Sequence, residues 1–192
     1  MQYRKEAVYQ QLLDSAMEEF DEKGYTDASI RSIAERANTS VGNLYRYFRN
    51  KDELYVSCLM PVLDECIDWT GKIFDISTPE AICFTAARIS DYVNRHSREF
   101  RIISQGPASH YSTFLCRFAA CIERQLRHYA ASELSTSNPK FLNTLANAFI
   151  AGMRQIMEDF DSEQAKDLYL LEFMQFRFGN FRERLKNPQE VQ

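Results

Sequence analysis

Histidines and cysteines are the side chains of this sequence best suited to bind a metal or to act as nucleophiles. His96, His110 and His128 share no spacing typical of a metal site or a catalytic pair, and the sequence has no Gly-rich loop that could hold a phosphate. We therefore expect a protein that is not an enzyme and that has no metal site and no cofactor.

The cysteines are odd in number and form no C-x2-C pair; they are Cys58, Cys66, Cys83, Cys116 and Cys121. We interpret them as buried thiols in a reducing compartment, not as a zinc site or a disulfide framework. Cys116 and Cys121 are five residues apart and could instead sense oxidants, but no set of positive neighbours clearly lowers their pKa.

Positive charge is concentrated between Ser29 and Lys51, in a chain whose net charge is −4. This segment contains five basic residues and a single acid, Glu35, whereas acidic residues gather elsewhere, for example between 14 and 22. A basic face on an acidic protein suits local contact with phosphate better than general coating of nucleic acid.

Within the basic segment, the sequence SVGNLYRYF has side chains suited to reading DNA. Gly42 lets the backbone approach closely, and Asn43 can both donate and accept hydrogen bonds, as recognition of an adenine edge requires. The hydroxyls of Tyr45 and Tyr47 suit phosphate. Lys51 lies at the start of a following helix, where backbone N–H groups could help to hold one phosphate.

Three helices are expected to position these residues. Apolar residues recur every four positions from Val8 to Phe20, which predicts a helix over about 3–23 that ends at Gly24. Ser29 is the expected cap of a short second helix.

A tight turn at Asn38 and a third helix over about 41–47, capped by Ser40, complete the pattern. Two short helices joined by a tight turn behind a longer helix form a helix-turn-helix, whose second short helix fits the major groove.

The rest of the chain also predicts helices, and Gly and Pro are scarce. Their expected ranges are about 51–69, 79–95, 97–104, 109–132, 139–159 and 162–178. Pro61 lies within the first of these, so we expect a kink near it. The prediction is an all-α protein of about nine helices.

At these N-terminal residues the sequence resembles the TetR family of bacterial regulators. The resemblance covers about the first 54 residues, with more than a dozen positions in fixed register. The segments that carry it are Phe20-x3-Gly24-Tyr25, Ser29-Ile30-x2-Ile33-Ala34, Ala37-Asn38-Thr39-Ser40-x-Gly42-x-Leu44-Tyr45-x-Tyr47-Phe48 and Lys51-x2-Leu54.

The sequence departs from the family pattern at two places. The family usually has Gly-Val where this chain has Asn38-Thr39, and Asn can still make the turn. We expect the fold to survive, with slightly lower stability or with an extra phosphate contact from Thr39. The position before Ser29 is Ala28, where the family often has Thr, so one phosphate contact is expected to be missing.

The resemblance implies a helix-turn-helix DNA-binding domain over residues 1–50 and a helical ligand-sensing and dimerisation domain over 51–192. It implies a homodimer that binds double-stranded DNA at a palindromic operator and represses transcription until a small molecule, of a kind the sequence does not identify, releases it. An activator, or a regulator without an inducer, is the alternative. The residues expected to contact DNA are Ser29, Arg31, Thr39, Ser40, Val41, Gly42, Asn43, Tyr45, Arg46, Tyr47 and Lys51.

Aromatic and polar residues in the middle of the chain are candidates for the ligand pocket, although for each of them ordinary packing is the simpler interpretation. They are Trp69, Phe84, Arg88, Tyr92, His96, Arg101, Gln105, Tyr111, Phe114 and Phe118. If Arg88 or Arg101 faces the pocket, the ligand is expected to be anionic.

The last two helices are strongly apolar, and the second is apolar nearly all round, so a two-fold seam between two copies is expected there. The residues predicted for this dimer interface are Phe141, Leu145, Ala148, Phe149, Gly152, Leu171, Met174 and Phe178. The alternative is that both faces pack within one monomer.

No run of about 18 apolar residues is present, and the N-terminal sequence has no apolar signal core. We therefore expect a cytoplasmic protein without a membrane span. A helical adaptor that no longer binds DNA is a further alternative, against which Gly42, Tyr47 and Lys51 argue.

Overall fold

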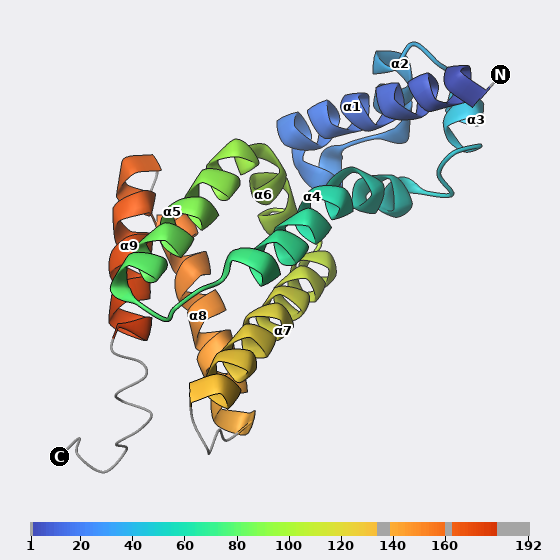
Figure 1. Cartoon of the computed structure of the whole chain (residues 1–192). Coiled ribbons are helices and arrows are strands. Elements are labelled where there is room, and N and C mark those ends of the chain that lie inside the picture. Colours follow the sequence, from blue (N-terminus) through green and yellow to red (C-terminus); the bar gives the residue numbers. More distant parts are fainter. Residues whose placement is uncertain (1, 134–138, 160–162, 180–192) are drawn as a thin grey trace. The chain divides into compact units, whose positions relative to one another are not determined.

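The computed structural model describes residues 2–133, 139–159 and 163–179, and the regular structure in these ranges is helical throughout (Figure 1). The described helices are α1 (Gln2–Asp27), α2 (Ile30–Arg36), α3 (Val41–Leu44), α4 (Lys51–Ile73), α5 (Pro79–Arg95), α6 (Ser97–Ser104), α7 (Ala108–Glu133), α8 (Pro139–Asp159) and α9 (Glu163–Phe178). The all-α prediction is confirmed, with an N-terminal helix-turn-helix followed by further helices. Among the described residues no helix is long and apolar enough to cross a membrane.

The chain divides into two compact units. The head unit comprises Met1–Glu65 and His96–Thr113, and the body unit comprises Cys66–Arg95 and Phe114–Gln192. This division differs from the boundary predicted between residues 50 and 51, because the first part of α4, all of α6 and the start of α7 group with the helix-turn-helix.

Gly24 lies inside the range of α1 but has a backbone conformation that interrupts the helix. Its φ is 71° and its ψ is 171°, a combination that only glycine adopts readily. The predicted end of the helical run at Gly24 therefore corresponds to a kink, and the last turn, up to Asp27, lies on a new axis.

The two short helices begin as their sequence signals predict. The Ser29 hydroxyl accepts from the N–H of Ser32 at 3.0 Å, and the Ser40 hydroxyl accepts from the N–H of Asn43 at 3.1 Å. Between them Asn38 adopts the left-handed conformation, with a φ of 48°. Local side-chain caps and one tolerant residue thus build the turn.

Helix α3 is shorter than the predicted 41–47. After Leu44 the chain forms turns, in which the N–H of Arg46 donates to the carbonyl of Asn43 at 3.1 Å and that of Tyr47 to Leu44 at 2.9 Å. These bonds span three residues, so the helix tightens into turns before α4.

Asn50 caps helix α4, because its side-chain oxygen accepts from the N–H of Glu53 at 2.7 Å. It continues through Pro61 as one helix to Ile73, four residues beyond the predicted end.

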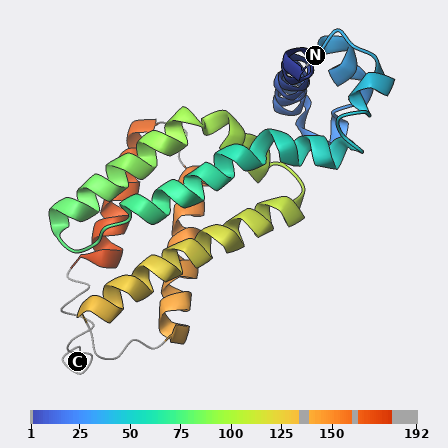
Figure 2. The same cartoon turned by 45° about the vertical axis from the view of Figure 1, so that its right-hand side comes forward.

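In the body unit, α9 packs against α5 and α8 (Figures 1 and 2). The buried ring of Phe149 lies 5.7 Å from the ring of Phe173 and 5.3 Å from that of Phe178. Gly152 permits this packing, since a Cβ there would lie 2.2 Å from the Phe173 ring. Helices α8 and α9 are therefore joined through aromatic packing within one chain.

Candidate nucleic-acid interface

The residues predicted to contact DNA lie on or beside the two short helices of the head unit. The exposed members of the set are Ser29, Arg31, Ser40, Val41, Gly42, Tyr45 and Arg46, and the half-buried members are Thr39, Asn43, Tyr47 and Lys51. The structure thus brings most of them to the surface of the helix-turn-helix, where a ligand as large as DNA could reach them.

Asn43 is oriented by its neighbours before any DNA arrives. Its backbone N–H is held by the Ser40 cap, and its side-chain amide donates to the hydroxyl of Thr39 at 2.9 Å. This bond uses one amide hydrogen and leaves the other hydrogen and the amide oxygen as the donor and acceptor that an adenine edge requires. Thr39, a departure from the family pattern, therefore positions the side chain of Asn43, whose contact with a base stays a prediction.

Three arginines provide positive charge at the surface of this region. Arg46 and Arg49 are exposed, and among the described residues their guanidinium groups have no partner. Arg31 pairs through Nε with Glu35 at 2.9 Å and keeps its terminal N–H groups exposed. Arg49 is exposed like Arg46, so both are candidates for a phosphate contact.

Lys51 is used within the protein. Its Nζ donates to the carbonyls of Tyr25 at 2.7 Å, Ala28 at 3.0 Å and Thr26 at 3.2 Å, and it lies 4.6 Å from the centre of the Tyr25 ring. An ammonium group has three N–H donors, so all of them are occupied. Lys51 therefore ties the start of α4 to the link between α1 and α2, and its predicted phosphate contact stays a prediction.

Glu19 is a buried acid that joins α1 to α2. Its carboxylate accepts from Lys23 at 2.8 Å, the Ser32 hydroxyl at 2.8 Å and the Ser29 N–H at 3.3 Å, with Arg36 Nη2 at 3.4 Å. Burial alone would raise the pKa of this carboxyl, but the hydrogen bonds from Lys23, Ser32 and Ser29 hold the pKa below its ordinary value. The charge is thus stabilised in a position that aligns the second helix.

The ion pair of Glu19 was not predicted, although its position in the sequence carries a signal. Glu19 lies three residues after Ala16 and seven after Leu12, on the apolar face that the four-residue recurrence defines. An acid on the buried face of a helix next to a basic segment indicates an internal ion pair.

Three further contacts join α6 and the start of α7 to the rest of the head unit. The Asp21 carboxylate pairs with Arg101 at 2.7 Å and with Arg98 at 3.2 Å. His110 Nε2 lies 2.6 Å from Asp52 Oδ1. Arg101, predicted for the ligand pocket, therefore holds α6 against α1.

Tyr55 joins α4 to α6. Its hydroxyl donates to the carbonyl of Ile102 at 2.8 Å, and burial raises the pKa of this phenol well above its ordinary value. Gly106 is required beside it, since a Cβ there would lie 1.8 Å from the Tyr55 hydroxyl.

The predicted ligand-pocket residues do not gather in one unit. His96, Arg101, Gln105 and Tyr111 belong to the head unit, and the other six belong to the body unit. Within the body unit the rings of Trp69 and Tyr92 stack at 5.3 Å, with the Arg88 guanidinium 5.4 Å from the Trp69 ring. In the same unit Phe114 and Phe118 are buried and stacked at 5.8 Å, whereas Phe84 is exposed.

The predicted dimer-interface residues are divided between core and surface of the body unit. Leu145, Phe149, Met174 and Phe178 are buried, Ala148, Gly152 and Leu171 are half-buried, and Phe141 is exposed. Phe141 lies on α8, and the exposed large apolar side chains among the described residues of α9 are Leu168, Tyr169 and Phe176. The surface that a second copy could meet thus differs in composition from the predicted set.

Two of the cysteines are held in low-reactivity settings. Burial raises the pKa of the Cys58 thiol to about 12 and also raises that of Cys121. The Cys121 thiol lies 3.3 Å from the carbonyl of Ile67. Thiolate formation is disfavoured at both positions. The prediction that the cysteines are buried is wrong for Cys116, which is exposed, and Cys58 and Cys83 are only half-buried.

Residues 12–58 match the sequence profile described as bacterial regulatory proteins, tetR family.

Three of the relatives that share sequence with parts of this chain are described below. The fatty acid metabolism regulator protein of Bacillus subtilis is 31% identical over 65 residues, which are 34% of this chain and 34% of the relative. The transcriptional activator FasR of Mycolicibacterium smegmatis is 32% identical over 95 residues, 48% of this chain and 43% of that one. The transcriptional repressor KstR of Rhodococcus jostii is 41% identical over 61 residues, 32% of this chain and 28% of that one. The matches thus span less than half of each relative's length.

Solved structures extend the likeness of fold to most of the chain. SmeT, the repressor of the Stenotrophomonas maltophilia multidrug efflux pump SmeDEF, aligns with a TM-score of 0.71 at 15% identity, over 88% of this chain and 89% of that one. FadR of Bacillus subtilis, in complex with stearoyl-CoA, aligns with a TM-score of 0.62 at 15% identity, over 89% of this chain and 98% of that one. The head of this chain thus matches the tetR family profile, and its fold is similar to that of solved structures described as TetR-family transcriptional regulators.

Proposed function

We propose that this chain is a transcriptional regulator that binds double-stranded operator DNA through α2 and α3, and that it represses transcription until a small molecule releases it. The observation that carries DNA binding is the exposed face of the helix-turn-helix. Asn43 presents one free amide hydrogen and its amide oxygen there. Arg46 and Arg49 follow in the sequence, and their guanidinium groups have no partner among the described residues.

The domain roles follow from this proposal. Residues 1–50 supply the DNA contacts, and residues 51–192 supply ligand sensing and dimerisation. Because α6 is bound to α1 through Asp21 and the start of α7 to α4 through Asp52, a change in α6 or α7 would act directly on the DNA-binding helices.

A homodimer is the proposed binding species, which implies a palindromic operator. The exposed apolar side chains Phe141, Leu168, Tyr169 and Phe176 on α8 and α9 support this proposal, since water contact with so much apolar surface is unfavourable. Sedimentation of the purified protein tests it, and Phe176→Asp is expected to shift the dimer toward monomer. If the protein were a monomer at all concentrations, the proposed homodimer and its palindromic operator would be wrong.

Activation is the second candidate, favoured by one observation. FasR, an activator, matches this chain over 95 residues, a longer stretch than either of the other two relatives. KstR, by contrast, is a repressor. Expression of a reporter behind the bound promoter, with and without the regulator gene, decides between the two. Repression predicts higher reporter expression without the gene, and activation predicts lower expression.

Fluorescence anisotropy with labelled DNA from upstream of the protein's own gene tests DNA binding directly. Affinity for a specific site is expected to fall steeply between low and moderate salt, because released counterions drive phosphate binding. Asn43→Ala should reduce discrimination between the specific site and random DNA, and Arg46→Ala should weaken both and lower the salt slope by about one.

Lys72→Ala is the matched control, since Lys72 is an exposed lysine of the body unit that pairs with Asp68. It should leave both DNA affinity and salt slope unchanged. Absence of specific binding at this promoter would move the search to a selection of bound genomic fragments. If that selection also returned no preferred sequence, the proposed function would be wrong.

A further inference from the structure

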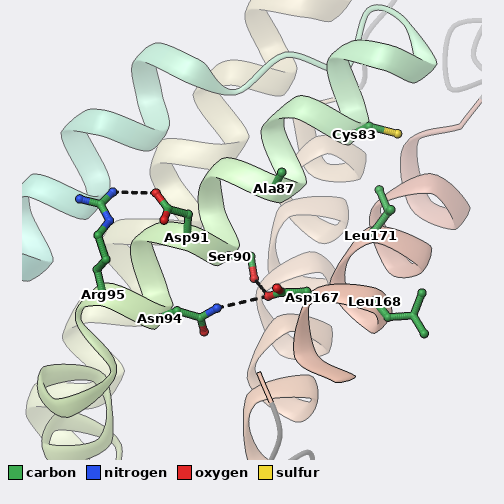
Figure 3. A pocket seen from close by; sticks show the side chains of 9 residues that line it. All are labelled: Cys83, Ala87, Ser90, Asp91, Asn94, Arg95, Asp167, Leu168 and Leu171. Carbon is green, nitrogen blue, oxygen red and sulfur yellow. Dashed lines mark hydrogen bonds and ion pairs between the residues drawn. The ribbon is translucent and has the colours of Figure 1, made fainter. Parts of the chain in front are cut away.

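The body unit has a hollow of about 610 Å³ between α5 and α9 (Figure 3). None of the ten residues predicted for a ligand pocket lines it, and Leu171 is its single member from the predicted dimer interface. A volume of this size is within the range of about 300–1,000 Å³ that small-molecule sites occupy. We propose that this hollow binds a small organic cation, a protonated amine carrying a short apolar group, with the ammonium on Asp167.

The charges of the hollow favour a cation. Its lining contains two carboxylates, Asp91 and Asp167, and one guanidinium, Arg95. Asp91 pairs with Arg95 at 3.0 Å, so these two charges balance each other. Among the described residues the partners of Asp167 are neutral donors, which leaves its negative charge uncompensated.

The Asp167 carboxylate is held by hydrogen bonds to one of its two oxygens. Ser90 and Asn94 both donate to Oδ1, the latter at 3.3 Å, as the two dashed lines to Asp167 in Figure 3 show. Within the described part of the chain Oδ2 accepts no hydrogen bond. Ser90 is 4% exposed, so its hydroxyl is a buried group that fixes the carboxylate from inside the protein. An oriented carboxylate with a free oxygen is suited to a charge-assisted bond from an ammonium group.

The same hollow offers apolar surface for the rest of the ligand. Ala87 on α5 has a short side chain that leaves space in the hollow. Leu168 and Leu171 line it from α9, one and four residues after Asp167. One charged contact beside aliphatic side chains matches an amine with a short hydrocarbon group, and it disfavours both a purely ionic ligand and an acid.

Titration calorimetry of the full-length protein with n-hexylamine hydrochloride at neutral pH tests the proposal, with sodium hexanoate and 1-hexanol as probes of the same chain length. Saturable binding of hexylamine is expected, with hexanol weaker and hexanoate without saturation. Asp167→Asn should weaken hexylamine binding at least tenfold, since it removes the charge, and its side-chain oxygen can still accept from Ser90 and Asn94. Ala87→Leu should weaken binding to a similar extent by filling the hollow.

Glu172→Gln is the matched control, because Glu172 is an exposed acid of α9 that does not line the hollow. It should bind hexylamine as the unaltered protein does. Equal binding of hexylamine and hexanoate, no saturable hexylamine binding in the millimolar range, or equal losses in Asp167→Asn and Glu172→Gln would each overturn the proposal. If Asp167→Asn unfolds, Ala87→Leu and the three probes decide, and the outcome is independent of whether the protein binds DNA.

Discussion

Replacing Lys51 with Met is expected to lower the free energy of unfolding of the head unit by about 2.5 kcal/mol. Each of the part-buried bonds to the carbonyls of Tyr25 and Ala28 contributes about 1 kcal/mol after a discount for partial exposure. The bond to the exposed Thr26 carbonyl is replaced by water, and loss of the cation–π contact with Tyr25 adds about 0.5 kcal/mol.

Urea unfolding followed by circular dichroism measures this difference, which corresponds to about 5–10 °C in melting temperature for a chain of this size. Arg46→Met is the control, because it removes the same charge from an exposed side chain without a partner among the described residues. It should change stability by less than about 0.5 kcal/mol and lower the salt slope of DNA binding by about one. If instead Lys51→Met kept full stability and lowered the salt slope, Lys51 would be a phosphate contact, and the assignment of its three donors to the chain would be refuted.

Three other substitutions test single features of the fold. Gly24→Ala is expected to lower the free energy of unfolding in urea by about 1–3 kcal/mol, because the backbone conformation there suits only glycine. Gly42→Ala is the comparison, since no atom lies nearer than 4.0 Å to the added Cβ. It should keep stability and weaken DNA binding. Because the pKa of Glu19 is lowered in the folded state, its contribution is present above its ordinary pKa of 4.5 and lost as pH falls below it. Glu19→Gln should therefore lose more stability at pH 7 than at pH 3, and an equal loss at both would contradict the ion-pair network. Gly152→Ala should lower stability by about 1–3 kcal/mol by pushing against Phe173, and an unchanged urea midpoint would mean that α8 and α9 can separate without cost.

The helix-turn-helix could be predicted because its determinants are local. The caps at Ser29 and Ser40 each bond to a backbone N–H three residues ahead, and the left-handed conformation at Asn38 depends on one residue type. The length of α3 was overestimated, since the change from helix to turn after Leu44 depends on how the chain must reach α4 and leaves no mark in the residue pattern.

The role of a long polar side chain could not be predicted from its position. Lys51 and the carbonyl of Tyr25 are separated by 26 residues, and a lysine at the start of a helix serves equally well to hold a phosphate or a carbonyl. Arg101 has the same ambiguity, because its partner Asp21 is 80 residues away. In both cases the sequence specifies the donor and the fold specifies the acceptor.

Aromatic residues alone do not identify a binding site, for a related reason. Tyr92, Phe114 and Phe118 are buried and stacked, as ordinary packing requires, and periodicity alone does not separate a core from a cavity wall. The hollow in the body unit arises instead where a small residue, Ala87, faces a helix that begins more than 70 residues later. Neither Ala87 nor Asp167 indicates a site by its position in the sequence, because the hollow forms only where α5 and α9 pack side by side.

The start of α4 explains why the head unit is larger than the sequence motif. Lys51 binds the link between α1 and α2, Asp52 meets His110 at the start of α7, and Tyr55 bonds to Ile102 of α6. Three side chains within five residues therefore join the helix-turn-helix to segments about 50 residues further along the chain. A boundary at 50/51, natural from the family pattern, would divide this hydrogen-bonded junction. Under the proposed function, the same junction is where a ligand-induced shift of α6 or α7 would be converted into movement of the DNA-binding helices, because these contacts cannot adjust one element and leave the others in place.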